Sequence, residues 1–200
     1  MANDCSFEMH ARGAPEALGE LIADMLGTQN ADGSDRVPHM ARVFEAEVTK
    51  KTDAKRRIWS RRKDVATTEW QQTWHIVGTC AWSSLVCMTH ADPCCYGSDK
   101  TTGARQGWFI GLEEEATLRN LDIELHDSEG GMEFATRIIA MPNTPLVIES
   151  YDYHEIFYTP GQDDINELTN EYGLTAQEVS ALMSGDCVVR TTMPDTWLIP

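Results

Sequence analysis

The chain has 200 residues, 42% of them hydrophobic and 24% charged, with a formal charge of −16 at pH 7 and a pI near 4.6. This is the composition of an ordinary globular domain, and the length suffices for one core, or for one core with a small appended module. The negative field argues against general affinity for nucleic acid or anionic membranes, and no apolar run approaches the roughly 20 residues that a membrane span needs.

The N-terminal part predicts a strand, a helix and a second strand. Apolar and polar residues alternate through 7–12, which is typical of a half-buried strand. Residues 15–26 begin with a proline and carry apolar side chains at helical spacing, and Gly27 is suited to cap the end of this helix. Alternation returns in residues 44–49 and predicts the second strand.

Eight of the sixteen basic residues lie between Lys50 and Lys63 with one acid among them, so this segment carries +7 and the other 186 residues carry −23. Its apolar content is almost confined to Ile58 and Trp59, and we expect an exposed insertion at about 50–64. Three alternatives stay open for it: a solvated loop folded against the acidic body, contact with nucleic acid through charge and Trp59 stacking, or contact with an acidic protein surface or RNA–protein complex. The candidate contact residues are Lys50, Lys51, Arg56, Arg57, Trp59, Arg61 and Arg62.

The middle of the chain predicts mixed helix and strand. A third strand is expected at 72–79, followed by a short buried helix within 81–88, a loop at 92–107, a helix at 112–120, a strand around 123–125, a hairpin turn at 128–131, and strands at 132–140 and 146–158. Glu113, Glu114 and Glu115 suit the positive N-terminus of the helix at 112–120.

The C-terminal part predicts two short helices and a last strand at 187–190. The first helix spans 163–172, and Thr175 with Glu178 forms a capping-box pattern that begins the second. The segment 171–179 resembles the turn of a helix-turn-helix, but the helix after it offers no Lys or Arg to phosphates. A small packed helical hairpin is therefore the preferred interpretation.

The strand–helix–strand–strand–helix–strand order over residues 4–127 predicts an α+β fold, a ferredoxin-like sandwich. The strands at 132–140 and 146–158 would extend its antiparallel sheet. We expect this domain to occupy residues 1–158, with a C-terminal helical hairpin and tail packed on it over residues 159–200.

The cysteines and histidines offer a metal or nucleophile hypothesis. Five donor residues lie within sixteen positions, namely Cys80, Cys87, His90, Cys94 and Cys95. They are zinc-ligand types, but no Cys-x2-Cys pair is present, and a catalytic pair of Cys80 or Cys94 with His75 or His90 matches no known signature. The N-terminus lacks the pattern of a signal peptide, so we expect reduced thiols packed in a core, with no metal, no cofactor and no catalytic residue.

Three short blocks carry a resemblance: residues 1–9 with the strand and helix that follow, Arg42–Ala46, and residues 78–83 leading into Cys87–Met88. They resemble the ferredoxin-like domain of small uncharacterised proteins carried by phages, plasmids and integrated elements, over about residues 1–158. The resemblance implies a mobile-element setting and a counter-defence or host-takeover role. The resemblance assigns no activity to any residue of this chain.

Residues 106–200 contain 18 acids and 3 bases, a density at which carboxylates can stand in for phosphates on a basic partner. Together with the resemblance, this favours a non-catalytic acidic binding protein of the bacterial cytoplasm, an anti-defence inhibitor of the anti-CRISPR or anti-restriction type. It would block a host protein or nucleoprotein complex with a basic surface, with direct nucleic-acid contact only through 50–63. The acidic contact residues would be Glu113, Glu114, Glu115, Asp163 and Asp164; the alternative is a small metal-binding or enzymatic module using residues 80–95.

Overall fold

The computed structural model describes residues 4–34, 37, 39–40, 42–57, 68–89 and 109–199, with only the main chain of 54–57 and 68–70. Within these ranges the elements are β1 (Asp4–Gly13), α1 (Pro15–Leu26), β2 (Val43–Arg57), β3 (Thr68–Ala81), α2 (Ser84–Met88), α3 (Leu112–Arg119), β4 (Asp122–Glu129), a 3-10 turn (Gly130–Met132), β5 (Phe134–Ala140), β6 (Val147–Ile156), α4 (Ile165–Tyr172), α5 (Ala176–Met183) and β7 (Val188–Thr191). No helix of the described residues is long and apolar enough to cross a membrane.

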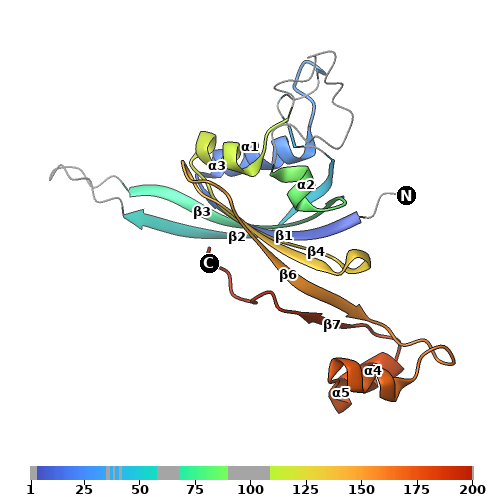
Figure 1. The fold of residues 1–200 in the computed structure, drawn as a ribbon. Helices are drawn as coiled ribbons and strands as arrows, with labels where there is room; N and C mark the ends of the chain where they lie inside the picture. Colours follow the sequence, from blue (N-terminus) through green and yellow to red (C-terminus); the bar gives the residue numbers. More distant parts are fainter. Residues whose placement is uncertain are drawn as a thin grey trace.

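The strands form one antiparallel sheet in the order β2-β3-β1-β4-β5-β6-β7, and the sheet is strongly curled (Figure 1). The prediction of a small ferredoxin-like sandwich is therefore wrong. Strands β5, β6 and β7 continue the sheet well past β4, and each of them pairs with its neighbour in the chain. Short connections from β4 to β5 and from β5 to β6 cost little loop entropy, and β7 joins β6 after α4 and α5, so the sheet reaches a size that its few helices do not cover.

Helices α1, α2 and α3 cover one face of the sheet (Figure 1). Leu18, Leu21 and Met25 of α1 are fully buried against the inward side chains of β1, as their helical spacing predicts. Gly27 ends α1 in the left-handed conformation that glycine adopts without strain. Burial stabilises the fold by about 1.5–3 kcal/mol for each such side chain. The expected N-terminal strand and helix are thus confirmed.

The basic run begins inside the sheet. Strand β2 continues to Arg57, and its second half pairs with β3, from Lys50 opposite His75 to Arg57 opposite Thr68. Residues 50–57 of the expected insertion are therefore strand, and the rest of it lies outside the described residues. Hydrogen bonds to β3 extend the strand through a stretch whose side chains show no apolar stripe.

Gly78 of β3 has a main-chain oxygen of β2 and an aromatic ring of β1 close to its Cα. A Cβ atom at this position would lie 2.1 Å from the carbonyl oxygen of Glu45 and 2.4 Å from the ring of Phe7. Only a glycine fits such an approach without displacing main-chain atoms.

Helices α4 and α5 lie between β6 and β7, at the far end of the sheet from α1 (Figure 1). They pack on each other and on β6 and β7 through a second hydrophobic cluster of Ile156, Leu174, Leu182 and Val188. Thr175 and Glu178 form the expected capping box at the start of α5. The two helices therefore interrupt the sheet, and β7 rejoins it afterwards by pairing with β6.

Candidate functional site

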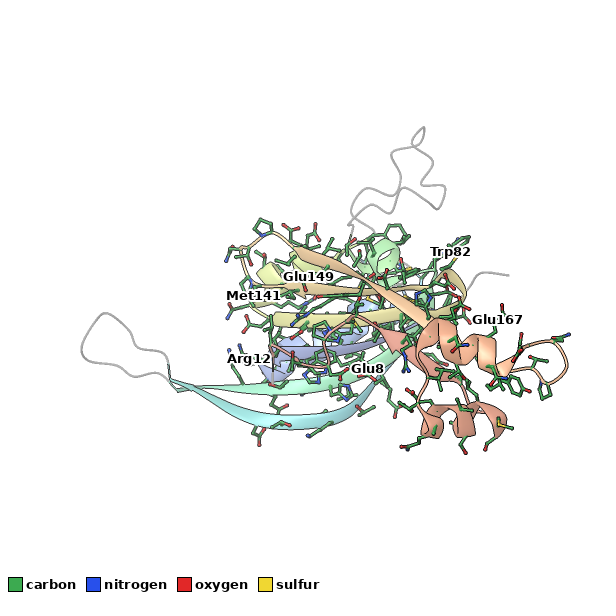
Figure 2. The ribbon with its side chains drawn as sticks, turned by 60° about the horizontal axis from the view of Figure 1, so that its bottom comes forward. Glu8, Arg12, Trp82, Met141, Glu149 and Glu167 are labelled. Atoms are coloured by element: carbon green, nitrogen blue, oxygen red, sulfur yellow. The ribbon has the colours of Figure 1, made fainter. Side chains whose placement is uncertain are left out.

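The face of the sheet opposite α1 carries rows of polar side chains, because strand residues that oppose each other across a ladder share a face. One row runs across five strand pairings from β2 to β6. Its members are Glu47, Glu8, His126, Arg137 and Glu149, with the apolar Val77 of β3 between the first two. A neighbouring row places His75, His10 and Glu124 side by side on β3, β1 and β4. Figure 2 brings this face forward, with Glu8 and Arg12 of β1 labelled on it.

The C-terminal segment crosses this polar face. We call residues 193–199 the strap. Its Trp197 indole stacks on the imidazole of His10, with ring centroids 4.0 Å apart, and on the imidazole of His126, with centroids 3.9 Å apart. His10 also donates through Nδ1 to the carbonyl oxygen of Ile199 at 2.6 Å. Ile199 is only 1% exposed, so the end of the strap is buried against the sheet.

Glu124 is the polar anchor of the strap, and it is completely buried. Its Oε2 accepts the main-chain N–H groups of Leu198 at 2.6 Å and Ile199 at 2.9 Å. Its Oε1 accepts both Nε and Nη2 of Arg137, at 2.9 and 2.6 Å, and Nε2 of His126 at 3.2 Å. One buried carboxylate thus accepts five hydrogen bonds from three parts of the chain, which offsets the cost of burying its charge.

These contacts shift two pKa values beneath the strap. Burial raises the pKa of Glu124, but the hydrogen bonds from Ile199, Arg137, His126 and Leu198 outweigh it, so the net pKa is lowered. Burial lowers the pKa of His126, and the opposing attraction of Glu124 does not restore it. The docked strap therefore covers an ionised Glu124 and an imidazole that resists protonation.

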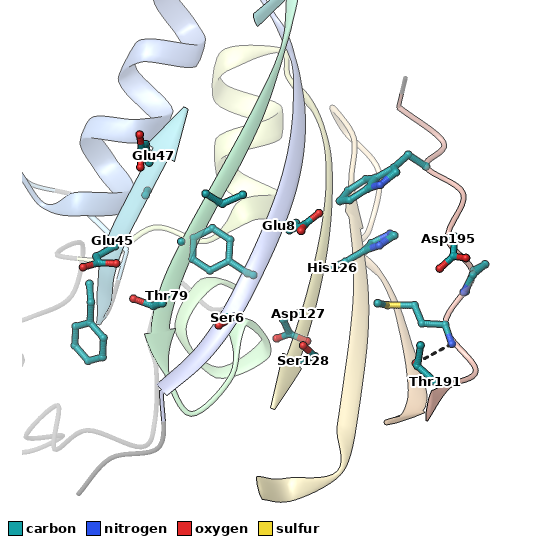
Figure 3. Close-up of a pocket in the computed structure, with 18 of the residues that line it drawn as sticks. Ser6, Glu8, Glu45, Glu47, Thr79, His126, Asp127, Ser128, Thr191 and Asp195 are labelled. Carbon is teal, nitrogen blue, oxygen red and sulfur yellow. Dashed lines mark hydrogen bonds between the residues drawn. The ribbon is translucent and has the colours of Figure 1, made fainter. Parts of the chain in front are cut away.

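A groove of about 920 Å³ lies between the sheet and the strap. Its walls come from β2, β3, β1 and β4 on one side and from Met193, Pro194, Asp195 and Trp197 of the strap on the other (Figure 3). The exposed acids that line it are Glu8, Glu45, Glu47 and Asp195. Its described lining contains no lysine and no arginine, so the groove is negative.

His75 lies between a hydroxyl and a carboxylate at the edge of this groove. Its Nδ1 is 2.7 Å from Thr49 Oγ1, and its Nε2 is 3.5 Å from Glu8 Oε2. An imidazole in such a position can take a proton from a hydroxyl. Thr49 Oγ1 is also within 3.3 Å of the main-chain oxygen of His75, however, so the contact equally serves to hold β2 against β3.

None of the basic residues of the sequence prediction lines the groove, as far as the structure describes them. Lys50 and Lys51 are exposed on β2, and Lys51 Nζ lies 3.9 Å from the ring centroid of Trp74. Arg56 and Arg57 are placed only by their main chain in β2. Trp59, Arg61 and Arg62 lie outside the described residues.

The predicted acidic contact residues fall into two distant places. Glu113 and Glu114 are exposed in the first turn of α3, on the helical side of the sheet, whereas Asp163 and Asp164 are exposed just before α4. Glu115 is 0% exposed. Its Oε2 accepts Nε of Arg119 at 2.7 Å, so Glu115 is bonded inside the core and cannot meet a partner from this position.

Of the residues that suggested a metal site, only Cys80 and Cys87 lie in the described part of the chain. Cys80 and Cys87 are buried in the main core together with Cys5, and the Cys87 thiol donates to the carbonyl oxygen of Ala81 at 2.8 Å. His90, Cys94 and Cys95 lie outside the described residues. Within the described part of the chain, no three His, Cys, Asp or Glu residues are placed to hold a metal ion.

Sequence reasoning missed the strap and its anchor. The alternating polar residues of β1 and β4 were a signal for an open polar face, since Glu8, His10 and Arg12 occupy every second position. No local pattern pairs Ile199 with His10, which precedes it by 189 residues.

Comparison with known proteins gives no relative for this fold or site. The sequence matches no protein-family model, and neither a curated protein nor a solved structure is significantly similar to it. The mobile-element resemblance of the short sequence blocks therefore stays a prediction, and function has to be inferred from the residues of the chain itself.

Proposed function

We propose that the protein acts by binding, and that its acidic groove receives a basic, lysine- and arginine-rich segment of a partner protein. The observation that carries this proposal is the charge of the groove. Its exposed charged lining residues, Glu8, Glu45, Glu47 and Asp195, are all acids. A concave surface lined by one sign of charge concentrates the opposite sign and speeds its encounter.

The internal ion pairs occupy the arginines of the C-terminal half. Each of the three arginines in residues 106–200 is paired with a carboxylate of the chain: Arg119 with Glu115, Arg137 with Glu124, and Arg190 with Glu178. These three arginines each pair with one acid of the fold, and no other lysine or arginine of residues 106–200 balances the remaining acids there. The charge presented to a partner by this half is therefore negative.

The partner class follows from this charge. An acidic groove repels phosphate, so the expected partner surface is a protein surface that itself binds nucleic acid. Joined to the sequence resemblance, this makes the protein an inhibitor carried by a phage or mobile element that blocks a nucleic-acid-handling complex in the bacterial cytoplasm. Restriction and CRISPR complexes are the defence systems of that kind.

The proposal is tested by titrating the purified protein with an octapeptide of alternating lysine and arginine in a calorimeter. The double variant Glu45→Gln/Glu47→Gln removes two charges from the groove, and Glu113→Gln/Glu114→Gln removes two from α3 on the opposite side of the sheet. We expect the groove variant to weaken binding roughly tenfold, which is about 1.4 kcal/mol, and the α3 variant to change it little.

Salt provides the second arm of the test. The Debye length falls from about 30 Å at 0.01 M to about 8 Å at 0.15 M, so the affinity should drop steeply between these ionic strengths. An equal loss of affinity in both double variants would mean that the octapeptide responds to the net charge of the protein and not to the groove. Loss only in the α3 variant would move the site to Glu113 and Glu114, and an affinity independent of salt would exclude charge recognition.

A further inference from the structure

The strap is held by a few concentrated contacts and by no strand pairing. After β7 ends at Thr191, residues 193–199 cross the sheet as an irregular segment with bends at 193, 195 and 198, and they join none of its ladders. The contacts that fix the strap are the Trp197 stacking, the buried Ile199 side chain, the two N–H groups on Glu124 and the His10 hydrogen bond. A segment held at so few points can detach without unfolding the sheet.

The groove depends on this segment. Met193, Pro194, Asp195 and Trp197 form one of its walls, and the polar face of the sheet forms the other (Figure 3). When the strap detaches, one acid and the wall that carries it leave the groove, and the remaining acids lie on an open surface. Exposed charges on an open, hydrated surface attract a partner more weakly than the same charges in a groove.

We propose that the strap is a releasable wall of the groove: docked, it completes the site for a basic segment, and acidification acting on His126 beneath it releases the strap together with the bound partner. This inference rests on the proposed function, because it assigns the regulation of that same site. The charge change lies at His126, whose ring stacks on the Trp197 indole.

The surroundings of His126 decide the direction of the effect. His126 faces Glu124 on its own strand, Glu8 on β1 and Arg137 on β5, and Glu149 of β6 pairs with Arg137. This face also carries His75 beside His10, Lys50 opposite His75, and the Arg12–Asp122 pair. Further out lie Glu45 and Glu47 of β2, Tyr151 beside Glu149 on β6, and Asp195 of the strap.

The sign follows from linkage. Burial under the strap holds the pKa of His126 below its ordinary value, whereas a released strap would return this imidazole to water. The docked state thus binds fewer protons at His126 than the released state. Docking is fully stable above the ordinary histidine range and weakens as the pH falls through it. Glu124, whose pKa is also lowered, acts in the same direction at more acidic pH.

Strap docking can be measured without any ligand. The N–H groups of Leu198 and Ile199 donate to Glu124 only in the docked state, so their NMR resonances and hydrogen-exchange protection report docking directly. Between pH 7.5 and pH 5.5 we expect both amides to shift and to lose protection, while amides of the sheet keep theirs. The variant His126→Phe keeps an aromatic ring under Trp197 without a titratable nitrogen, and should hold the strap to lower pH.

The role of the strap as a wall is tested by Trp197→Ala, with Leu198→Ala as the matched control. Leu198 belongs to the same strap, but its side chain is 60% exposed and its main-chain N–H is kept in the variant. We expect Trp197→Ala to expose both amides at pH 7.5 and to weaken octapeptide binding roughly tenfold, and Leu198→Ala to change neither. Circular dichroism melting checks that each variant is folded.

The possible failures are distinguishable. Equal protection of the two amides at pH 5.5 and 7.5 in the wild-type protein would refute the pH-driven release. Unchanged octapeptide affinity in a Trp197→Ala protein with a released strap would refute the strap as a wall. If the octapeptide fails to bind the wild-type protein at every pH while the amides still respond to pH, the proposed function is wrong.

Discussion

Replacing Glu115 by glutamine should remove a large pH dependence of stability. Glu115 is fully buried between α1 and α3, with Arg119 and Asp24 beside it. Burial, and after it the neighbouring Asp24 carboxyl group, raise the pKa of Glu115 to about 7 against the lowering effect of Arg119. The folded protein therefore keeps a proton at this site that the unfolded chain releases near pH 4.5.

The size of the effect follows from linkage. A pKa raised from 4.5 to about 7 corresponds to about 3 kcal/mol between the two protonation states. Because the folded pKa is the higher one, this contribution is fully present below pH 4.5 and is lost as the pH rises through 7. A glutamine at this position stays neutral at every pH and keeps an oxygen that can accept from Arg119. The Glu115→Gln protein should match the wild type near pH 4.5 and exceed its unfolding free energy at pH 8.5.

Urea unfolding followed by tryptophan fluorescence, at pH values from 4.5 to 8.5, measures this difference. Subtracting the wild-type curve from the variant curve cancels the other titrating groups, including His126 and Glu124, whose pKa values are shifted the opposite way. The control is Glu113→Gln, which changes an exposed glutamate of the same helix and should leave the slope with pH unchanged. If Glu115→Gln and Glu113→Gln give the same pH profile, Glu115 is ionised in the fold and the reasoning is refuted.

Three further predictions test the packing and the ion pairs. Gly78→Ala should destabilise the fold by about 3 kcal/mol in urea unfolding, because the new Cβ would lie 2.1 Å from a main-chain oxygen. Gly19→Ala in α1, where a Cβ would have nothing within 4 Å, should instead stabilise the fold by about 0.5–1 kcal/mol. Leu182→Ala should weaken the cluster around α4 and α5 by about 2–3 kcal/mol, seen as faster amide exchange in α5 with β1 unchanged. Arg190, and after it Thr175, lower the pKa of Glu178 to about 2, so an NMR titration should find this carboxyl group ionised far below pH 4.5. The variant Arg190→Gln should raise the midpoint of that titration. An unchanged midpoint would disprove the pair.

Most of the helices and strands could be predicted from local patterns. The alternation of β1, the helical spacing of Leu18, Leu21 and Met25, and the Thr175–Glu178 capping box each lie within one element. Such patterns are fixed by side-chain periodicity and by the caps of the helix, which do not depend on the rest of the fold. The extent of β2 could not be predicted this way, because pairing with β3 carries it through the basic run to Arg57.

The candidate site was much less predictable. Three consecutive glutamates predicted an acidic contact surface, but successive helical residues are rotated by about 100°, so Glu115 faces the core while Glu113 and Glu114 face water. The choice between these positions depends on what packs against α3. The groove residues Glu45 and Glu47 belong to a strand that the alternation of residues 44–49 predicted. That pattern did not show which face of the strand would line a groove.

The sequence by itself determined the excess of acid, most elements, and the alternation that leaves one face of the sheet polar, because these are properties of composition and of neighbouring residues. Only the tertiary structure decided the seven-strand order, the burial of Glu115 and the docking of the strap. Each of these depends on contacts between residues far apart in the chain, as between His10 and Ile199, 189 positions later. Such contacts depend on the balance between loop closure, burial and hydrogen bonding over the whole molecule, which no short segment encodes.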